Sequence, residues 1–324
     1  MRAFIFPGQG SQAVGMGQAL AAASPTAKAV FQEVDDALGQ HLFKLMCEGP
    51  ESDLTLTENA QPAIMANAIA TLRVSEVEGG VSLGSKCSFV AGHSLGEYSA
   101  LCAAGTFDLA TTARLLKLRG RAMQAAVPVG IGAMAALLGA DIEKAEALAK
   151  AAAEGETCTV ANDNDPSQVV ISGHKSAIDR AVELVKEHGI KRGILLPVSA
   201  PFHCPLMQPA ADAMAEALGK TELQTPIVPL YANVTADAVV DPDTIRAQLV
   251  EQVTGRVRWR ESAIAMAGAG VTHFVEFGGK VLSPMVKRSA GEEVSTASII
   301  SMDDIEALFK ETLIPCSAKT GTPR

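Results

Sequence analysis

The five residues from Gly92 to Gly96 read Gly-His-Ser-Leu-Gly, and they constrain the fold of this chain more than any other stretch. The apolar residues 87–91 before them predict a short buried strand, and residues 97–103 after them predict a helix. A strand, a tight turn and a helix in this order lift the central serine out of a sheet as a nucleophile. The helix start supplies free N–H groups where an oxyanion would form. Ser94 is therefore our candidate nucleophile, and a glycine-bordered loop with an incidental serine is the alternative.

The length of 324 residues predicts two domains, or a large domain that carries a smaller one. Residues 128–197 show the order strand, helix, strand, strand, helix, strand, which is the pattern of a ferredoxin-like unit. We predict a loop at residues 162–166 within it. The large α/β domain should comprise residues 1–127 and 198–313, and residues 314–324 should form a polar tail. In the large domain we expect a buried helix over residues 61–78 with a proline in its first turn.

Charge and cysteine content exclude several classes of protein. The net charge is −9 and there is no basic run, which argues against nucleic-acid binding. The six cysteines include no Cys-x-x-Cys pair, so we expect reduced thiols and no zinc site. No apolar run suits a signal peptide or a membrane span. These features predict a cytoplasmic protein.

The glycine-rich turn that follows the first apolar run has two interpretations. Gly8, Gly10 and Ala13 fit a loose dinucleotide fingerprint, which also needs an acidic residue at the end of a second strand. Glu33 has about the right distance but lies in a segment with helical spacing, so nucleotide binding is not favoured. We expect the turn to present Gln9 near the same sheet edge as Ser94.

A serine needs a general base, and His203 is the histidine best placed to serve. It lies between Pro201 and Pro205, in a loop that follows the return of the chain to the large domain. His93 adjoins Ser94, so its side chain should leave the turn in another direction. No carboxylate near His203 is an evident third partner, and a backbone carbonyl could orient it instead. Two alternatives stay open, namely that His203 is a structural loop residue and that Cys204 is the nucleophile.

Arg119 lies in a helix predicted for residues 109–126. Arg114, Lys117 and Arg121 share one face of that helix, which we expect to be solvated. Arg119 is offset toward the apolar side, where an unpaired guanidinium is costly. It should therefore meet either a carboxylate of the protein or an anionic ligand, and its planar fork suits a carboxylate.

Together these segments resemble the malonyl-CoA:acyl-carrier-protein transacylase family of fatty acid synthesis. The resemblance runs from the first strand to about residue 300. It is carried by Phe-Pro-Gly-Gln-Gly-Ser-Gln at residues 6–12, Gly-His-Ser-Leu-Gly-Glu-Tyr at 92–98, Arg-Gly-Arg-Ala-Met at 119–123 and Ala-Pro-Phe-His at 200–203. It implies an α/β hydrolase-like, parallel-sheet core with an inserted ferredoxin-like small domain.

The resemblance also implies roles for single residues. Ser94 would accept the acyl group, His203 would be its base, and the main-chain carbonyl of Gln252 would orient His203. The N–H groups of Gln9 and Leu95 would form the oxyanion hole. The substrate-binding residues would be Arg119 for the malonyl carboxylate, Phe202 for malonyl preference and Asn162 at the domain interface.

The implied reaction moves malonyl from malonyl-CoA to Ser94, releases coenzyme A, and then passes malonyl to the pantetheine thiol of acyl carrier protein. No metal or redox cofactor is needed. Because the carrier is acidic, we expect a basic patch of Lys280, Lys287 and Arg288 to dock it. Gly279 stands where the family usually has proline, so that loop should be more flexible. We expect a monomer, although the sequence leaves oligomeric state and the choice between fatty acid and polyketide carriers open.

Two other functions share parts of this pattern. A thioesterase or esterase would use Ser94 and His203 but gives no reason for Arg119 on an apolar face. A non-catalytic carrier-binding module leaves both the Ser94 turn and the His203 loop unexplained.

Overall fold

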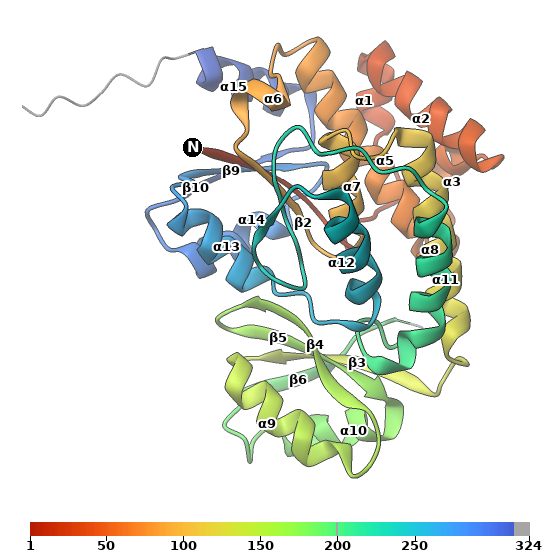
Figure 1. Ribbon diagram of the computed structural model, residues 1–324, viewed down its shortest axis with the longest axis vertical. Coiled ribbons are helices and arrows are strands. Elements are labelled where there is room, and N and C mark those ends of the chain that lie inside the picture. Colours follow the sequence, from red (N-terminus) through yellow and green to blue (C-terminus); the bar gives the residue numbers. More distant parts are fainter. Residues whose placement is uncertain (199, 314–324) are drawn as a thin grey trace, which may run out of the picture.

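The computed structural model describes residues 1–198 and 200–313, and the predicted polar tail at 314–324 lies outside them. Two β-sheets organise the described chain, a larger one of six strands and a smaller one of four. Figure 1 shows the small sheet with its two helices below the larger α/β body. The fold is therefore the mixed α/β architecture that the sequence predicts.

The large sheet has the strand order β10-β9-β1-β2-β7-β8 and is parallel except for the short β7–β8 pair. Its strands are β1 (Arg2–Phe6), β2 (Phe89–Gly92), β7 (Leu230–Tyr231), β8 (Ala238–Val239), β9 (His273–Phe277) and β10 (Ser295–Ile299). β1 lies near the centre, and its register places Phe6 opposite Gly92. The carboxyl ends of β1 and β2 therefore meet at one sheet edge, which is where parallel sheets place their ligands.

Helices cover both faces of the large sheet because β1 is apolar on both sides. Phe4 and Phe6 belong to one buried cluster, and Ala3 and Ile5 belong to another. The first cluster packs among α1 (Gln18–Ala23), α2 (Pro25–Leu38), α3 (Leu42–Glu48), α4 (Glu51–Thr55), α5 (Thr57–Val77), α6 (Leu83–Lys86), α7 (Leu95–Ala103), α8 (Leu109–Ala126), the 3₁₀ turn η1 (Pro205–Met207), α11 (Gln208–Gly219), α12 (Pro242–Thr254) and α15 (Met302–Leu313). The second packs under α13 (Trp259–Gly268) and α14 (Leu282–Ala290).

The small sheet is antiparallel, with the order β4-β5-β3-β6. Its elements follow the predicted order, as β3 (Gly132–Leu138), α9 (Ile142–Ala153), β4 (Cys158–Asp165), β5 (Gln168–His174), α10 (Lys175–Leu184) and β6 (Arg192–Leu195). Ala135 and Leu137 of β3 pack in a cluster with the small domain's helices, whereas Met134 and Ala136 join the large core. The small sheet therefore lays its second face against the large domain.

Two direct ion pairs tie β4 to the large domain. Arg260 of α13 contacts Asp163 at 2.8 Å, and Arg288 of α14 contacts Asp165 at 2.7 Å. Both aspartates have no exposed surface. We call these four residues the seam. The backbone of Val257 adds hydrogen bonds to Ala161 and Asp163, at 2.8 and 2.9 Å.

The loop predicted at residues 162–166 is wrong for its first four residues. They continue strand β4 and pair with β5 through two register shifts. Their run of Asn and Asp side chains suggests a loop, but the seam arginines pair with the two aspartates and His93 contacts Asn164.

Two helices also differ from their predicted bounds. α5 begins at Thr57, so Pro62 lies inside the helix rather than in its first turn. Its first turn contains Thr57 and Asn59, which are polar yet buried, so the spacing of apolar residues does not indicate this start. The sequence predicts a helix over residues 176–188 that stops before Gly189, but α10 ends at Leu184 and the chain then turns to Gly189 at φ 66°. Residue 33 does lie in a helix, α2, as expected.

The face of α8 predicted to be solvated is only partly so. Arg114 and Arg121 are exposed, but Lys117 is buried and lies 3.0 Å from Glu58. Lys117 also donates to Asn59 of α5 at 2.8 Å. The charge pattern on α8 could not reveal these partners because they belong to another helix.

Candidate active site

The turn that carries Ser94 is made possible by two glycines. A Cβ atom on Gly92 would lie 1.9 Å from the carbonyl oxygen of Gly96, and one on Gly96 would lie 2.2 Å from that of Phe6. β2 therefore ends directly against α7, and Ser94 takes φ 55° and ψ −114° between them. That conformation is strained for a residue with a side chain, and it is typical of a nucleophile elbow.

The side chain of Asn233 holds the backbone of the elbow through two hydrogen bonds. Its Oδ1 accepts a hydrogen bond from the N–H of Ser94 at 2.8 Å, and its Nδ2 donates to the carbonyl of Gly92 at 2.6 Å. The strained turn is thus fixed on both sides of the serine. Asn233 follows β7, which pairs with β2, so sheet topology brings it here from far along the chain.

His203 meets Ser94 as the sequence predicts. Its Nε2 lies 2.7 Å from Ser94 Oγ, and its Nδ1 lies 2.8 Å from the carbonyl oxygen of Gln252. A carbonyl can only accept, so Nδ1 carries the hydrogen and Nε2 is free to accept the serine proton. This is the tautomer that a general base requires.

His203 is only 4% exposed, and its backbone has φ 56°. Burial, assisted by the nearby Arg119 cation, lowers the pKa of His203 to about 3. The histidine is therefore neutral at physiological pH and ready to take a proton. His93 points elsewhere, as expected, and its Nε2 lies 2.8 Å from Asn164 Oδ1.

Arg119 is buried, at 1% exposure, and its guanidinium reaches Ser94. One terminal nitrogen donates to Gln61 Oε1 at 2.9 Å. The other donates to Gln252 Oε1 at 2.8 Å and to Ser94 Oγ at 3.3 Å. Among the described residues no carboxylate lies within ion-pair distance of it. Its hydrogen-bond partners are therefore two neutral amides and the serine hydroxyl, and its guanidinium also lies over the Tyr98 ring, 5.7 Å from the ring centre.

Close packing of α8 on α5 brings Arg119 to this position. A Cβ atom on the next residue, Gly120, would lie 2.6 Å from the Thr57 carbonyl oxygen and the Glu58 Cα of α5. Only glycine permits so close an approach, and Gln61 on the same helix then meets the guanidinium.

A cavity of about 260 Å³ opens above Ser94, and we call it the Ser94 pocket. Large-domain residues supply one side, including Gln9 from the glycine-rich turn. The other side is formed by β3, β4 and the loop at residues 200–204, which contribute Met134, Asn162 and Phe202. The pocket therefore lies between the two sheets, and the substrate-binding candidates Asn162 and Phe202 both line it.

Of the two predicted oxyanion donors, Gln9 lines the Ser94 pocket and Leu95 follows Ser94 in the chain. Leu95 is the first residue of α7, and in the described chain neither its N–H nor that of Gln9 has an acceptor. The Gln9 side chain is fixed separately, because its Oε1 accepts from Thr57 at 3.0 Å. Both N–H groups are thus free to donate to a ligand beside Ser94.

Cys204 does not compete as the nucleophile. It has no exposed surface, its Sγ lies 3.1 Å from the Pro201 carbonyl, and burial raises the pKa of its thiol. It is not among the residues that line the Ser94 pocket.

Of the three basic residues expected at a docking patch, two lack an ion pair within the described chain and the third is paired with a buried aspartate. Lys280 is exposed and Lys287 half-buried, and no ion pair joins either to another described residue. Arg288 is engaged with Asp165 in the seam. The sequence could not show this, because Asp165 is distant along the chain.

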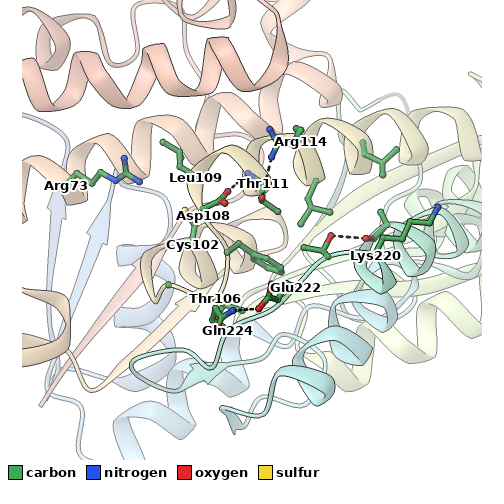
Figure 2. A pocket seen from close by; sticks show the side chains of 16 residues that line it. Arg73, Cys102, Thr106, Asp108, Leu109, Thr111, Arg114, Lys220, Glu222 and Gln224 are labelled. Atoms are coloured by element: carbon green, nitrogen blue, oxygen red, sulfur yellow. Dashed lines mark hydrogen bonds between the residues drawn. The ribbon is translucent and has the colours of Figure 1, made fainter.

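A wider cavity of about 870 Å³ lies on the other side of α8 and shares no lining residue with the Ser94 pocket (Figure 2). Its acidic groups are used locally, since Asp108 caps α8 through Thr111 and Glu222 accepts from Gln224. Burial raises the pKa of Cys102 to about 11, which leaves its thiol protonated. This cavity therefore lacks an activated nucleophile.

Within residues 1–198 and 200–313, no three His, Cys, Asp or Glu side chains gather as ligands for a metal ion. Over the same residues, none of the helices combines the length and apolar character that crossing a bilayer requires.

Comparison with known proteins adds independent information. The model of the acyl transferase domain family matches residues 3–304. The malonyl CoA-acyl carrier protein transacylase of Escherichia coli K12 is 45% identical over 287 residues, which cover 88% of this chain and 92% of that protein. The enzyme of the same name from Bacillus subtilis is 44% identical and covers 94% of this chain and 95% of its own length.

Solved structures agree with these sequence matches. The crystal structure of an acyl-carrier-protein-S-malonyltransferase from Bartonella henselae has a TM-score of 0.94 and 50% identity, with 97% of this chain and 99% of that chain covered. A malonyl-transacylase in complex with its type II polyketide acyl-carrier protein has a TM-score of 0.92 and 40% identity, with 96% and 99% covered.

Proposed function

This chain belongs to the acyl transferase domain family, and from that premise we propose that it transfers malonyl from malonyl-CoA to the pantetheine thiol of acyl carrier protein. The transfer would supply the extender unit for fatty acid biosynthesis. The names of the relatives support this reaction. The observation that carries it is Arg119, a buried cation beside Ser94 Oγ whose own partners are uncharged. Such a group suits an acyl chain that ends in a carboxylate.

In the first half-reaction, Ser94 Oγ attacks the thioester carbonyl while His203 Nε2 takes its proton. The Gln252 carbonyl holds the imidazole in the required tautomer. The N–H groups of Gln9 and Leu95 would stabilise the oxyanion, each by about 3 kcal/mol. His203 then returns the proton to the leaving coenzyme A thiolate.

In the second half-reaction, the pantetheine thiol attacks the malonyl-serine, and His203 again accepts and returns the proton. Splitting the transfer in two predicts ping-pong kinetics. Arg119 would hold the malonyl carboxylate throughout, with Phe202 and Asn162 forming walls of the pocket. A fixed acyl pose favours the bound thiol over water as acceptor.

We further propose that this enzyme works as a cytoplasmic monomer. Residues 1–127 and 198–313 would form the catalytic domain, and residues 128–197 the ferredoxin-like one. Lys280, Lys287 and Arg288 would attract the acidic carrier. Since Arg288 also neutralises buried Asp165, Lys280 and Lys287 supply the charge that is free for docking.

The direct test is the intact mass of the protein after mixing with malonyl-CoA alone. We expect one malonyl adduct, which disappears when holo acyl carrier protein is added and reappears on the carrier. Ser94→Ala should give no adduct, because the reacting oxygen is gone while the Cβ atom remains.

Other outcomes would identify other functions. Steady release of coenzyme A without an acceptor would mean hydrolysis. Neither adduct nor release would contradict both enzymatic readings and leave a binding module.

A further inference from the structure

Arg119 places a buried positive charge beside the Ser94 pocket, and none of its hydrogen-bond partners in the described chain carries a negative charge to balance it. Its guanidinium is buried and directly bonded only to amide oxygens and a hydroxyl. A buried cation without a counter-charge is strongly unfavourable. An anion held elsewhere in the site must therefore balance it before substrate arrives.

Glu97 is that anion by position. It lies in the first turn of α7, three residues after Ser94, and is only 1% exposed. Its Oε2 accepts from Gln252 Nε2 at 2.6 Å and from the backbone N–H of Asn233 at 3.3 Å. Neither donor is a cation.

A single amide side chain joins Glu97 to Arg119. Gln252 Oε1 accepts from the guanidinium at 2.8 Å, and its Nε2 donates to the carboxylate at 2.6 Å. The amide dipole therefore points its negative end at the cation and its positive end at the anion. Because the main-chain carbonyl of Gln252 also holds His203, one residue connects the counter-charge, the arginine and the base.

We propose that Glu97 is the resident counter-charge of Arg119 and takes up one proton when a malonyl carboxylate binds that arginine. The inference rests on the proposed function, and it makes Glu97 a positioning residue that acts through Gln252. A proton from solvent converts the Glu97 carboxylate to the neutral acid. Where Glu97 starts ionised, the pocket then holds one cation and one anion both before and after binding.

The surroundings of Glu97 favour such an exchange. Arg119 from α8 stabilises its charged form, while α12 and the Asn233 loop contribute only neutral amides. Tyr98 on its own helix is neutral, since burial raises its pKa, and buried His203 and His93, each with a lowered pKa, are neutral as well. Burial raises the pKa of Glu97 to about 7, and a second carboxylate at Arg119 would raise it further.

This linkage has a consequence for specificity. An acetyl group brings no charge, so it leaves the pair of Arg119 and ionised Glu97 intact. Malonyl must be accompanied by a proton, which becomes scarcer as pH rises. The preference for malonyl over acetyl should therefore fall as pH rises above about 7.

Proton uptake can be measured by calorimetry with the Ser94→Ala protein, which binds malonyl-CoA without reacting. Titrations in two buffers of different ionisation enthalpy give the number of protons bound. We expect about 0.5 proton at pH 7 and about 0.9 at pH 8 from a pKa of about 7. Acetyl-CoA should give none beyond the coenzyme's own contribution, which is common to both ligands. Adding Glu97→Gln should remove the uptake.

A second readout uses the reactive protein. With Ser94 intact, Glu97→Gln should show a malonyl-to-acetyl ratio of kcat/KM that stays flat between about pH 6 and pH 8.5. If Glu97→Gln does not fold, the two ligands compared in Ser94→Ala alone still decide.

Malonyl-CoA that binds without uptake at pH 8, or acetyl-CoA with equal uptake, would overturn the role of Glu97 and leave the proposed function standing. Malonyl-CoA that neither binds Ser94→Ala nor acylates the unmodified protein would overturn both.

Discussion

The seam and the Ser94 pocket use buried arginine–carboxylate electrostatics in opposite ways. At the seam, the guanidinium of Arg260 meets both oxygens of Asp163 directly, with its Nε 3.0 Å from each. In the Ser94 pocket, a glutamine separates Arg119 from Glu97. Direct contact neutralises an arginine and uses its N–H groups. An intervening amide lets Arg119 stay buried while it remains able to grip an incoming carboxylate.

The two regions are joined by one strand. On β4, Asp163 and Asp165 bind the large-domain arginines, while Asn162 lines the Ser94 pocket and Asn164 bonds His93. The direct ion pairs of the seam therefore fix the position of Asn162, which forms part of one wall of the Ser94 pocket.

The largest effect should come from removing a seam carboxylate. Asp163→Ala leaves Arg260 without its buried partner and should lower the free energy of unfolding by about 3 kcal/mol. The matched control is Asp179→Ala, which removes an exposed pair with Lys175 and should cost under about 1 kcal/mol. Denaturant unfolding of both variants gives the two free energies of unfolding. Equal decreases would mean that the seam pair contributes no more to stability than an exposed ion pair.

The next largest effect should be on specificity. Arg119→Ala removes the cation proposed to bind malonyl and should reduce the malonyl-to-acetyl ratio of kcat/KM by about 100-fold. Its stability loss should be smaller than that of Asp163→Ala, because no directly paired carboxylate is left behind. Arg114→Ala, on the same helix but facing the wider cavity, should change neither. An unchanged ratio for Arg119→Ala would refute its assigned role.

The pH dependence of Ser94 acylation should show how strongly the charge of Arg119 lowers the pKa of His203. A base with a lowered pKa stays unprotonated as pH falls, so single-turnover acylation should show no loss from His203 protonation between pH 7 and pH 5. Arg119→Ala removes one of the causes that lower the pKa of His203, the largest after burial. The acidic decline should then move toward neutral pH, measured with acetyl-CoA so that malonyl binding does not intervene. A decline at the same pH in both proteins would contradict the coupling.

The smallest effects should separate two neighbours on α14. Lys287→Glu should raise the apparent KM for acyl carrier protein about three-fold and leave acylation by malonyl-CoA unchanged. Arg288→Ala should instead lower stability, since it leaves Asp165 buried without a cation. Equal losses of acylation and transfer in Lys287→Glu would mean that the patch is not a docking surface.

The parts of the site that depend on residues close together in the chain could be predicted from the sequence. The turn at Ser94 is specified by two glycines within five residues, and the His203 loop by its two prolines. The unusual position of Arg119 was visible from helical spacing alone. The alternation of apolar residues likewise gave the order of elements in the small domain.

What sequence could not give are the contacts between distant segments. Gln61 and Asn233 carry no signature, because an amide becomes significant only when folding places it against a charge or a strained turn. Glu97 resembles an ordinary acidic residue in the first turn of a helix. The Asn-Asp run at 162–165 was misread because its partners lie roughly a hundred residues further on, in α13 and α14.

The positive φ angles of Ser94 and His203 have a consequence for stability. Both residues occupy backbone conformations that glycine would adopt with less strain, at φ 55° and 56°. Glycine at either position would relieve that strain but would remove the contact between Ser94 Oγ and His203 Nε2. The fold therefore stores backbone strain at two positions that are distant in the chain in order to hold one short contact between their side chains.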